Sequence, residues 1–353
     1  MLLAIVGGVL PALEVWPTRP ESFVTRQLLE GRLISVVARD RAGDAVTERL
    51  AVDFEDRRIE VDRLYQVGSA GAFDIQPGER VLFYETRAPN GTSYQFGDRG
   101  RGPQLLLVVA VFAVSVVIVG GWQGVWSIFG LASTVLVIGR FILPAILGGA
   151  SPVPVAIAGA IVIMAATLTL GHGAGRKTAI AFVATSAALI LAGLLATWAV
   201  DIATLSGLAG DDEATLLRFA SGVDMRGLLL AGIILGAVGV LDDVTTTQAS
   251  TVIELREADP TLGRRELFRR AMRVGRDHIA ATTNTLLLAY AGTALPLMVF
   301  FLDRGFSPVL VASFEPLATE VVRAAAGSIA IVAAVPLSSA VAALLVARSP
   351  RDA

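Results

Sequence analysis

The chain has no cysteine and only two histidines among its 353 residues. Without cysteine it can form no disulfide, thiolate nucleophile, iron–sulfur cluster or cysteine-ligated zinc site. The two histidines, His172 and His278, lie far apart in the sequence and do not have the spacing of a metal-ligand pair. The sequence therefore predicts no metal site and no cofactor.

Charged residues are also scarce, and they are unevenly distributed. They make up 17% of the chain, against 54% hydrophobic residues, and residues 104–200 contain only Arg140, Arg176 and Lys177. A soluble domain of that length could not stay in solution with so few charges. The net charge of −2, with no basic domain, excludes an electrostatic nucleic-acid site. The composition indicates a multi-pass protein embedded in a lipid bilayer.

Hydrophobic runs of membrane-spanning length begin at residue 104. They predict an all-α bundle with seven transmembrane helices, over residues 104–120, 124–148, 153–172, 178–200, 226–250, 278–302 and 319–346. Residues 1–16 are apolar, but as a helix they would reach only about 24 Å, against a hydrocarbon core of about 30 Å. This segment is an eighth span, a degenerate signal sequence or the stub of a longer span.

Residues 22–103 have a different composition, rich in polar and charged side chains. Short apolar runs at 33–38, 50–54 and 80–84 alternate with turn sequences. This alternation is typical of about five short strands. We therefore expect a small all-β domain, either a barrel or a sandwich. The alternative is a loosely folded soluble loop.

The distribution of arginine predicts the orientation of the spans. Seven arginines lie within residues 253–277. The positive-inside rule places such a stretch on the cytoplasmic side of the membrane, here a bacterial-type inner membrane. The tail, residues 348–353, then also lies in the cytoplasm, and the β-rich segment 22–103 lies outside it. Within the arginine-rich stretch, residues 261–275 predict a basic amphipathic helix along the inner leaflet.

Two adjacent carboxylates interrupt the span 226–250. Asp242 and Asp243 are the only charged residues between Arg226 and Glu254. Carboxylates at such a depth are costly and usually face a bundle interior or a water-filled cavity. Because the two repel each other in an apolar setting, at least one is expected to hold a proton, as a proton relay requires. The alternative is that the pair is a solvated helix cap at the cytoplasmic interface.

Three glycines share a helix face with one of these aspartates. Gly232, Gly236, Gly239 and Asp243 follow one another at i, i+4, i+7 and i+11. The pair Gly232 and Gly236 forms a GxxxG step, which is typical of close helix packing. This pattern predicts that Asp243 faces a neighbouring helix rather than lipid.

Two further residues are candidates to act with the aspartates. Asn284 begins the next span and can hydrogen-bond a carboxylate in either protonation state, although an ordinary helix contact worth about 0.6 kcal/mol is the alternative. Arg140 is a candidate intramembrane cation, but its depth favours snorkelling to the outer headgroups. The sequence contains no recognisable Ser-His-Asp arrangement. Intramembrane aspartyl cleavage needs two aspartates from different helices, whereas Asp242 and Asp243 belong to one helix. We therefore do not expect an enzyme.

Three stretches carry a resemblance to a known family. They are Gly239-Val240-Leu241-Asp242-Asp243, the helix ending in Arg269-Arg270-Ala271-Met272-Arg273, and Asn284 with the small-residue helix up to Pro296. Together they are similar to the YibE/F family of multi-pass membrane proteins, over about residues 105–346.

The span 226–250 and the span after it also resemble, more distantly, the fourth and fifth helices of resistance–nodulation–division exporters and of SecD/SecF. In those proteins the aspartates bind the driving protons, which the resemblance would place on Asp242 and Asp243. Those exporters have large extracytoplasmic domains and a second set of helices, which this chain does not match. The resemblance therefore implies a homo-oligomer or a companion membrane protein.

The sequence thus favours a proton-coupled transporter or export component in which Asp242 and Asp243 carry the proton and Asn284 adjusts the pair. A second interpretation is a membrane assembly or scaffold protein whose β domain binds a partner in the cell envelope. In that case the aspartates only cap a helix. The sequence does not identify the substrate.

Overall fold

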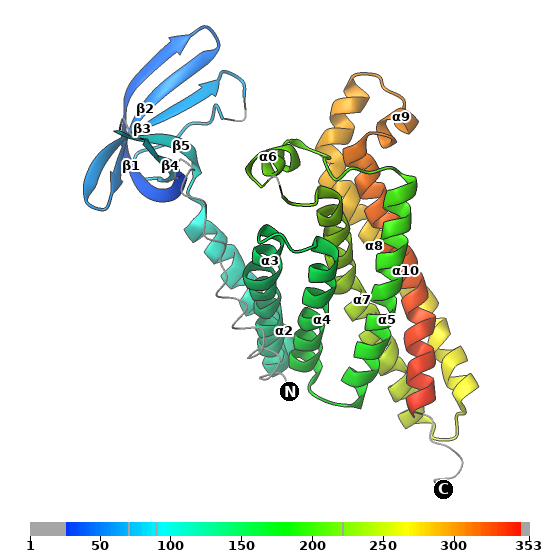
Figure 1. Cartoon of the computed structure of the whole chain (residues 1–353). Coiled ribbons are helices and arrows are strands. Elements are labelled where there is room, and N and C mark those ends of the chain that lie inside the picture. The colour runs from blue at the N-terminus through cyan, green and yellow to red at the C-terminus, as the bar shows by residue number, and fades with distance from the viewer. Residues whose placement is uncertain (1–25, 70, 89–90, 221, 347–353) are drawn as a thin grey trace. The chain divides into compact units, whose positions relative to one another are not determined.

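The computed structural model describes residues 26–69, 71–88, 91–220 and 222–346. Contacts among these residues divide them into two compact units, one ending at Ser115 and the other beginning at Val116 (Figure 1). The segments predicted at residues 1–16 and 348–353 lie outside the described residues.

The first unit contains a five-stranded barrel. Its strands are β1 (Arg26–Ala42), β2 (Ala45–Phe54), β3 (Arg57–Gln66), β4 (Arg80–Ala88) and β5 (Gly91–Arg99). They pair in the order β1-β2-β3-β5-β4 and close on themselves, with β3 and β5 parallel. This is the connectivity of an OB-type barrel. The structure thus confirms the predicted all-β domain and makes it a barrel.

The long strand β1 closes the barrel because it pairs along its length with two partners. Its first part pairs with β4 and its second with β2, and Arg32 has a partner in both. Irregularities after Leu33 and after Val36 bend the strand between these two pairings. Inward side chains then fill the centre as an apolar cluster of Leu33, Leu50, Val52, Val61, Ile75, Val81 and Phe83.

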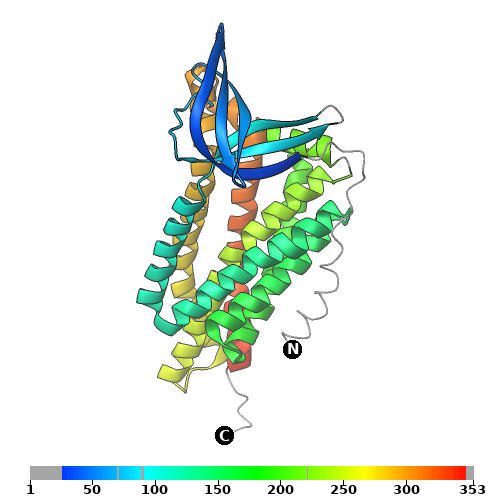
Figure 2. The ribbon, with the colours of Figure 1, turned by 90° about the vertical axis from the view of Figure 1, so that its left-hand side faces the viewer.

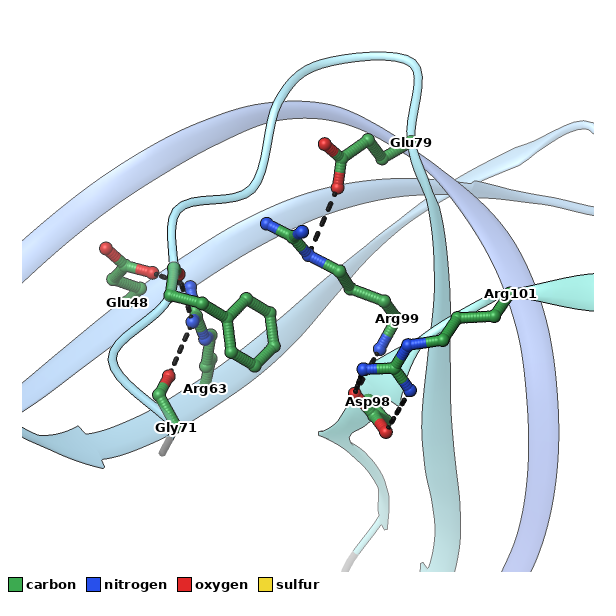
Figure 3. Close-up of polar contacts among 8 residues, drawn as sticks. Glu48, Arg63, Gly71, Glu79, Asp98, Arg99 and Arg101 are labelled. Carbon is green, nitrogen blue, oxygen red and sulfur yellow. Dashed lines mark hydrogen bonds and ion pairs between the residues drawn. The ribbon is translucent and has the colours of Figure 1, made fainter. Parts of the chain in front are cut away.

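A buried ion pair lies inside the barrel beside this cluster (Figure 3). Glu48 of β2 is 0% exposed and Arg63 of β3 is 3% exposed, and Arg63 Nη1 donates to Glu48 Oε2 at 2.8 Å. Arg63 Nη2 donates to the carbonyl oxygens of Gly71 at 2.6 Å and of Phe73 at 2.5 Å. The guanidinium therefore ties β2 to β3 and also fixes the segment that leads to β4.

At the end of β5, charged side chains form pairs of a more exposed kind. Arg99 lies 3.4 Å from Glu79, and Arg101 donates to both carboxylate oxygens of Asp98 (Figure 3). The hydrogen bonds from Arg101, followed by that from the backbone N–H of Arg99, lower the pKa of Asp98.

The described residues after the barrel are largely helical. The helical elements are α2 (Gly102–Val137), the π-helix η2 (Ile138–Ile142), α3 (Leu143–Leu147), α4 (Pro152–His172), α5 (Arg176–Ile202), α6 (Asp211–Phe219), α7 (Met225–Ala258), α8 (Arg264–Asp303), α9 (Pro308–Ala312) and α10 (Glu315–Val346). Within the described ranges, six helices are long and apolar enough to cross a membrane when Gly102–Leu147 is taken as one. This agrees with the predicted polytopic helical bundle.

The helix Gly102–Leu147 is interrupted where the sequence predicts the boundary between two spans. Gly121 has φ 55° and ψ −136°, which is outside the helical region. A Cβ on Gly124 would lie 2.3 Å from the carbonyl oxygen of Val116, although eight residues of straight helix would separate the two by about 12 Å. The chain therefore folds back at Gly121 (Figures 1 and 2). Its two arms correspond to the predicted spans 104–120 and 124–148.

The amphipathic segment 261–275 differs from the prediction. Instead of a separate helix on the membrane surface, most of it is the first part of the 40-residue helix α8. Its apolar residues Leu267 and Ala271 are 0% exposed and pack with Val252 of α7 and Ala342 of α10. The amphipathic pattern therefore reflects contact with neighbouring helices, which the sequence alone does not distinguish from contact with lipid.

Helix α7 is the central helix of the second unit. Half of the residues in its most apolar 18-residue stretch are buried, whereas no residue in the corresponding stretch of Gly102–Leu147 is. It packs against α4, α5 and α10. Small side chains at these contacts, such as Ala160, Ala188, Ala237 and Ala334, allow close approach of the helices.

Candidate functional site

Asp242 lies in α7 and directs its carboxyl group toward α4. Asp242 Oδ2 accepts a hydrogen bond from Thr167 Oγ1 at 3.1 Å. Asp242 Oδ1 is buried and has no hydrogen-bond partner. Among the described residues, no lysine, arginine or histidine forms an ion pair with Asp242. The structure thus places an uncompensated carboxyl group among apolar helices.

Asp243 has a different environment, although it is the next residue. Its side chain is 69% exposed, and Oδ2 lies 3.8 Å from Nε2 of His278 in α8. Successive residues of a helix point about 100° apart, so the burial of Leu241, Val244 and Thr245 turns Asp243 outward. The prediction that Asp243 faces a packed helix is therefore wrong, and Asp242 is the more enclosed of the two.

The three glycines on the Asp243 face do not form the predicted helix contact. A Cβ on Gly232 or Gly239 would meet nothing within 4 Å, and one on Gly236 would meet only the hydroxyl of Tyr290, at 3.1 Å. Helix α7 instead buries its branched and alanine face, which includes Ile234 and Val238. Among the described residues the GxxxG step therefore does not mediate helix packing, because the larger apolar residues on the other faces make the contacts.

A comparison with protein families bears on the same part of the chain. The family model described as YibE/F-like protein matches residues 108–348. The chain belongs to the YibE/F family. No curated protein and no solved structure matches it. The distant resemblance to resistance–nodulation–division exporters and to SecD/SecF is not shown by these comparisons.

The match covers the apolar helices and begins after the barrel. Residue 108 lies in the first turns of α2, so the five strands precede the matched segment. With its apolar helices of spanning length, this YibE/F-family chain is a multi-pass membrane protein. Asp242, Asp243 and their partners all lie within the family segment.

Two other predicted residues lie apart from the aspartates. Asn284 is exposed on α8, and the described hydrogen bonds include none from it to Asp242 or Asp243. Arg140 is exposed within η2, and it belongs to none of the ion pairs of the described residues. His278, the first residue of the predicted span 278–302, instead lies well inside α8 and approaches Asp243.

Polar residues of α7 in this family segment bind three different helices. Besides Asp242 with Thr167 of α4, the hydroxyl of Thr245 bonds that of Thr185 in α5. Gln248 Oε1 accepts from Ser339 Oγ of α10 at 2.9 Å. The three α7 residues are spaced three apart, so each is turned by about 60° from the one before, and Asp242 and Gln248 point about 120° apart.

Sequence reasoning missed the partners of these residues. Thr167, Thr185 and Ser339 are hydroxyl residues in largely apolar helices that also contain others, such as Thr169, Ser186 and Ser338. Such residues usually bond their own helix backbone. Thr185 also does so, donating to the carbonyl of Ala181 at 2.8 Å. No spacing rule distinguishes a hydroxyl that reaches another helix from one that does not.

Proposed function

We propose that this YibE/F-family membrane protein is a proton-coupled transporter in which Asp242 binds and releases the driving proton. The observation that carries the proposal is the buried Oδ1 of Asp242, which has no partner, in a carboxyl group without an ion-pair partner among the described residues. A charge buried without a counter-ion is costly. Exchange of a proton avoids that cost, and Thr167 can hydrogen-bond the carboxyl in either state.

Further polar atoms without protein partners support a proton path from Asp242 along α7. Thr246 Oγ1 and Gln248 Nε2 lie one to two turns beyond Asp242, and both are buried without a partner. In α8, Thr283 Oγ1 has the same property. Buried polar atoms of this kind commonly hydrogen-bond internal water. A chain of such waters would connect Asp242 to the C-terminal end of α7, where the arginine-rich stretch 253–277 begins.

We propose that this arginine-rich end lies in the cytoplasm, as the positive-inside rule predicts. The exposed carboxylate of Asp243, 3.8 Å from Nε2 of His278, would then face cytoplasmic water. Because the described residues contain a single set of helices, we further propose that the protein acts as a homo-oligomer or with a companion membrane protein. The unburied apolar helix Gly102–Leu147 offers a surface for that contact.

The test is an infrared titration of the protonated carboxyl band in the full-length protein in lipid nanodiscs, from about pH 4 to about pH 9. The wild type should show a carboxyl step near neutral pH. Asp242→Asn should remove that step. Asp243→Asn is the matched control, because Asp243 is the adjacent residue of the same type and its side chain is 69% exposed.

Two results would contradict the proposal. One is a wild-type spectrum in which every carboxyl group titrates as an exposed aspartate does, at about pH 4. The other is a neutral step that survives in Asp242→Asn and disappears in Asp243→Asn, which would move the proton to the exposed residue. Each variant should first elute as a monodisperse species in size-exclusion chromatography.

A second candidate function is a membrane scaffold whose barrel binds a partner in the cell envelope. The observation that favours it is a set of exposed apolar side chains on the strands, among them Leu28 at 54% and Leu64 at 74% exposure. In that case Asp242→Asn should leave function intact in cells, whereas deletion of residues 26–99 should abolish it. The proton-coupled transporter predicts loss of function in Asp242→Asn.

A further inference from the structure

The first unit contains an open cleft of about 730 Å³ where the barrel continues into α2. Its walls come from β1, the segment that leads into β4, the end of β5 and the first residues of α2. Because α2 begins an apolar membrane helix at Gly102, its first residues lie where the chain enters the bilayer. The cleft therefore lies at the level of the lipid headgroups.

The charged side chains that line the cleft are mostly positive. They are Arg32, Arg80, Arg99, Arg101 and Glu79, which give the lining a net charge of +3 (Figure 3). Two carboxylates outside the lining, those of Glu30 and Asp98, pair with Arg80 and Arg101 respectively. Including these two carboxylates still leaves a charge of +1, so the cleft favours an anion.

The uncompensated charge belongs to Arg32 of β1. Among the described residues, its exposed side chain forms no ion pair and no hydrogen bond. The residue directly opposite it on β4 is Arg80, and like charges in that position destabilise a strand pair. On its other side the opposite residue is Asp53 of β2, which forms no ion pair with it and does not line the cleft. An anion in the cleft would relieve the repulsion between the two arginines.

The backbone that carries these side chains is fixed by hydrogen bonds between strands and loop. The N–H of Leu33 donates to the carbonyl oxygen of Glu79 at 2.8 Å, and the N–H of Gly78 donates back to that of Leu33 at 2.7 Å. The N–H of Gly100 donates to the carbonyl oxygen of Arg80 at 2.8 Å. A ligand therefore meets a preformed cleft, which reduces the entropy lost on binding.

The wall that α2 contributes is apolar. Leu105 and Val108 line the cleft and are 60% and 64% exposed, and their spacing of three places them on one face of the helix. Gln104, which also lines the cleft, belongs to the first turn of α2, where backbone N–H groups have no acceptor within the helix and the helix dipole favours an anion. Positive charge thus lies next to an exposed apolar surface.

We propose that this cleft binds the headgroup of an anionic phospholipid. The phosphate pairs with Arg32 between the barrel and the start of α2, and an acyl chain lies along Leu105 and Val108. A soluble phosphate compound would leave this apolar wall uncovered, and a zwitterionic lipid would bring an ammonium group to a site of net positive charge. The inference is independent of the proton proposal, because every residue that lines the cleft precedes residue 116.

The experiment measures lipid binding to the full-length protein in detergent by native mass spectrometry. The probes are phosphatidylglycerol, which is anionic, and phosphatidylcholine with the same acyl chains, which is zwitterionic. The wild type should bind phosphatidylglycerol at least about fivefold more tightly, which is the effect of about one basic residue at an anionic membrane surface. Glycerol phosphate, which has the phosphate but no acyl chain, should not displace it.

Two variants with a control assign the binding to the cleft. Arg32→Gln should weaken phosphatidylglycerol at least about fivefold and leave phosphatidylcholine unchanged. Arg32→Lys should bind phosphatidylglycerol more tightly than Arg32→Gln does, because lysine keeps the positive charge. The matched control is Arg58→Gln. Arg58 of β3 is also exposed and also lies opposite Asp53, but it does not line the cleft.

Hydrogen exchange in nanodiscs gives the location of the bound lipid. Phosphatidylglycerol, compared with phosphatidylcholine, should slow exchange in peptides of residues 76–82 and 99–106 and leave the peptide of β3 unchanged. The proposal is overturned if the wild type binds both lipids equally, if Arg32→Gln and Arg58→Gln behave alike, or if glycerol phosphate displaces phosphatidylglycerol. It is also overturned if only the arginine-rich start of α8 is protected, which would place the lipid there.

Discussion

Replacing Arg63 by methionine tests whether the buried ion pair holds the barrel together. The variant removes the bond to Glu48, which is 0% exposed, and both bonds to the carbonyl oxygens of Gly71 and Phe73. Methionine keeps much of the apolar volume of the side chain but donates no hydrogen bond. Glu48 keeps its ion pair with Arg39 and its hydrogen bond from Tyr65. The cost therefore comes from the buried acceptors that lose their donor, and is about 1–3 kcal/mol.

The free energy of local unfolding of the barrel is measured by hydrogen exchange of the full-length protein in nanodiscs. Exchange is followed by mass spectrometry on peptides of β2 and β3. A loss of about 1–3 kcal/mol accelerates exchange of the slowest amides by about 5-fold to about 150-fold. Arg49→Met is the matched control. Arg49 belongs to the same barrel but is 54% exposed and lies 3.5 Å from the exposed Glu60, so the change should cost no more than about 1 kcal/mol.

Equal exchange rates in Arg63→Met and Arg49→Met would refute this reasoning. They would mean that the guanidinium inside the barrel contributes no more than one on the surface. A large effect confined to the peptide of residues 71–79 would also contradict it. In that case the side chain would fix only this segment and not the pairing of the strands.

Two further predictions concern the bend in α2 and the end of β5. Gly124→Ala should destabilise the detergent-solubilised protein by about 1–3 kcal/mol and so lower its thermal midpoint, because the new Cβ would lie too close to the carbonyl oxygen of Val116. Gly120→Ala is the control and should leave the midpoint unchanged, because its Cβ would meet nothing within 4 Å. Hydrogen bonds from Arg101 lower the folded-state pKa of Asp98, so its stabilisation is present above the unfolded value of about 3.9 and lost as pH falls through the folded value. The midpoints of urea unfolding of the barrel in wild type and in Asp98→Asn should accordingly differ at neutral pH and converge in acid.

The sequence alone predicted the class of the protein and most of its elements. Membrane residence follows from the scarcity of charge between residues 104 and 200, because no soluble domain stays in solution with so few. The strands were legible because one side of each faces the barrel core and alternates with polar residues, as in Leu50 and Val52 of β2. The break at Gly121 also falls between two predicted spans.

The tertiary structure decided what each face of a helix meets. In a membrane, lipid and protein neighbours are both apolar, so hydrophobic periodicity does not identify the packed face. For this reason the sequence placed Asp243 inward, whereas the structure encloses Asp242 and leaves Asp243 exposed beside His278. The amphipathic segment of α8 was assigned to lipid for the same reason.

Partners that are distant in the sequence likewise depend on the fold. Thr167 and Asp242 come from different helices, and so do Gln248 and Ser339, so no local spacing connects them. Glu315 of α10 likewise holds the segment before α6 through the backbone N–H groups of Ser206 and Gly207, which lie more than a hundred residues away in the sequence. The sequence determines which polar residues must enter the bilayer, and the packing of the helices determines which of them are left without a partner.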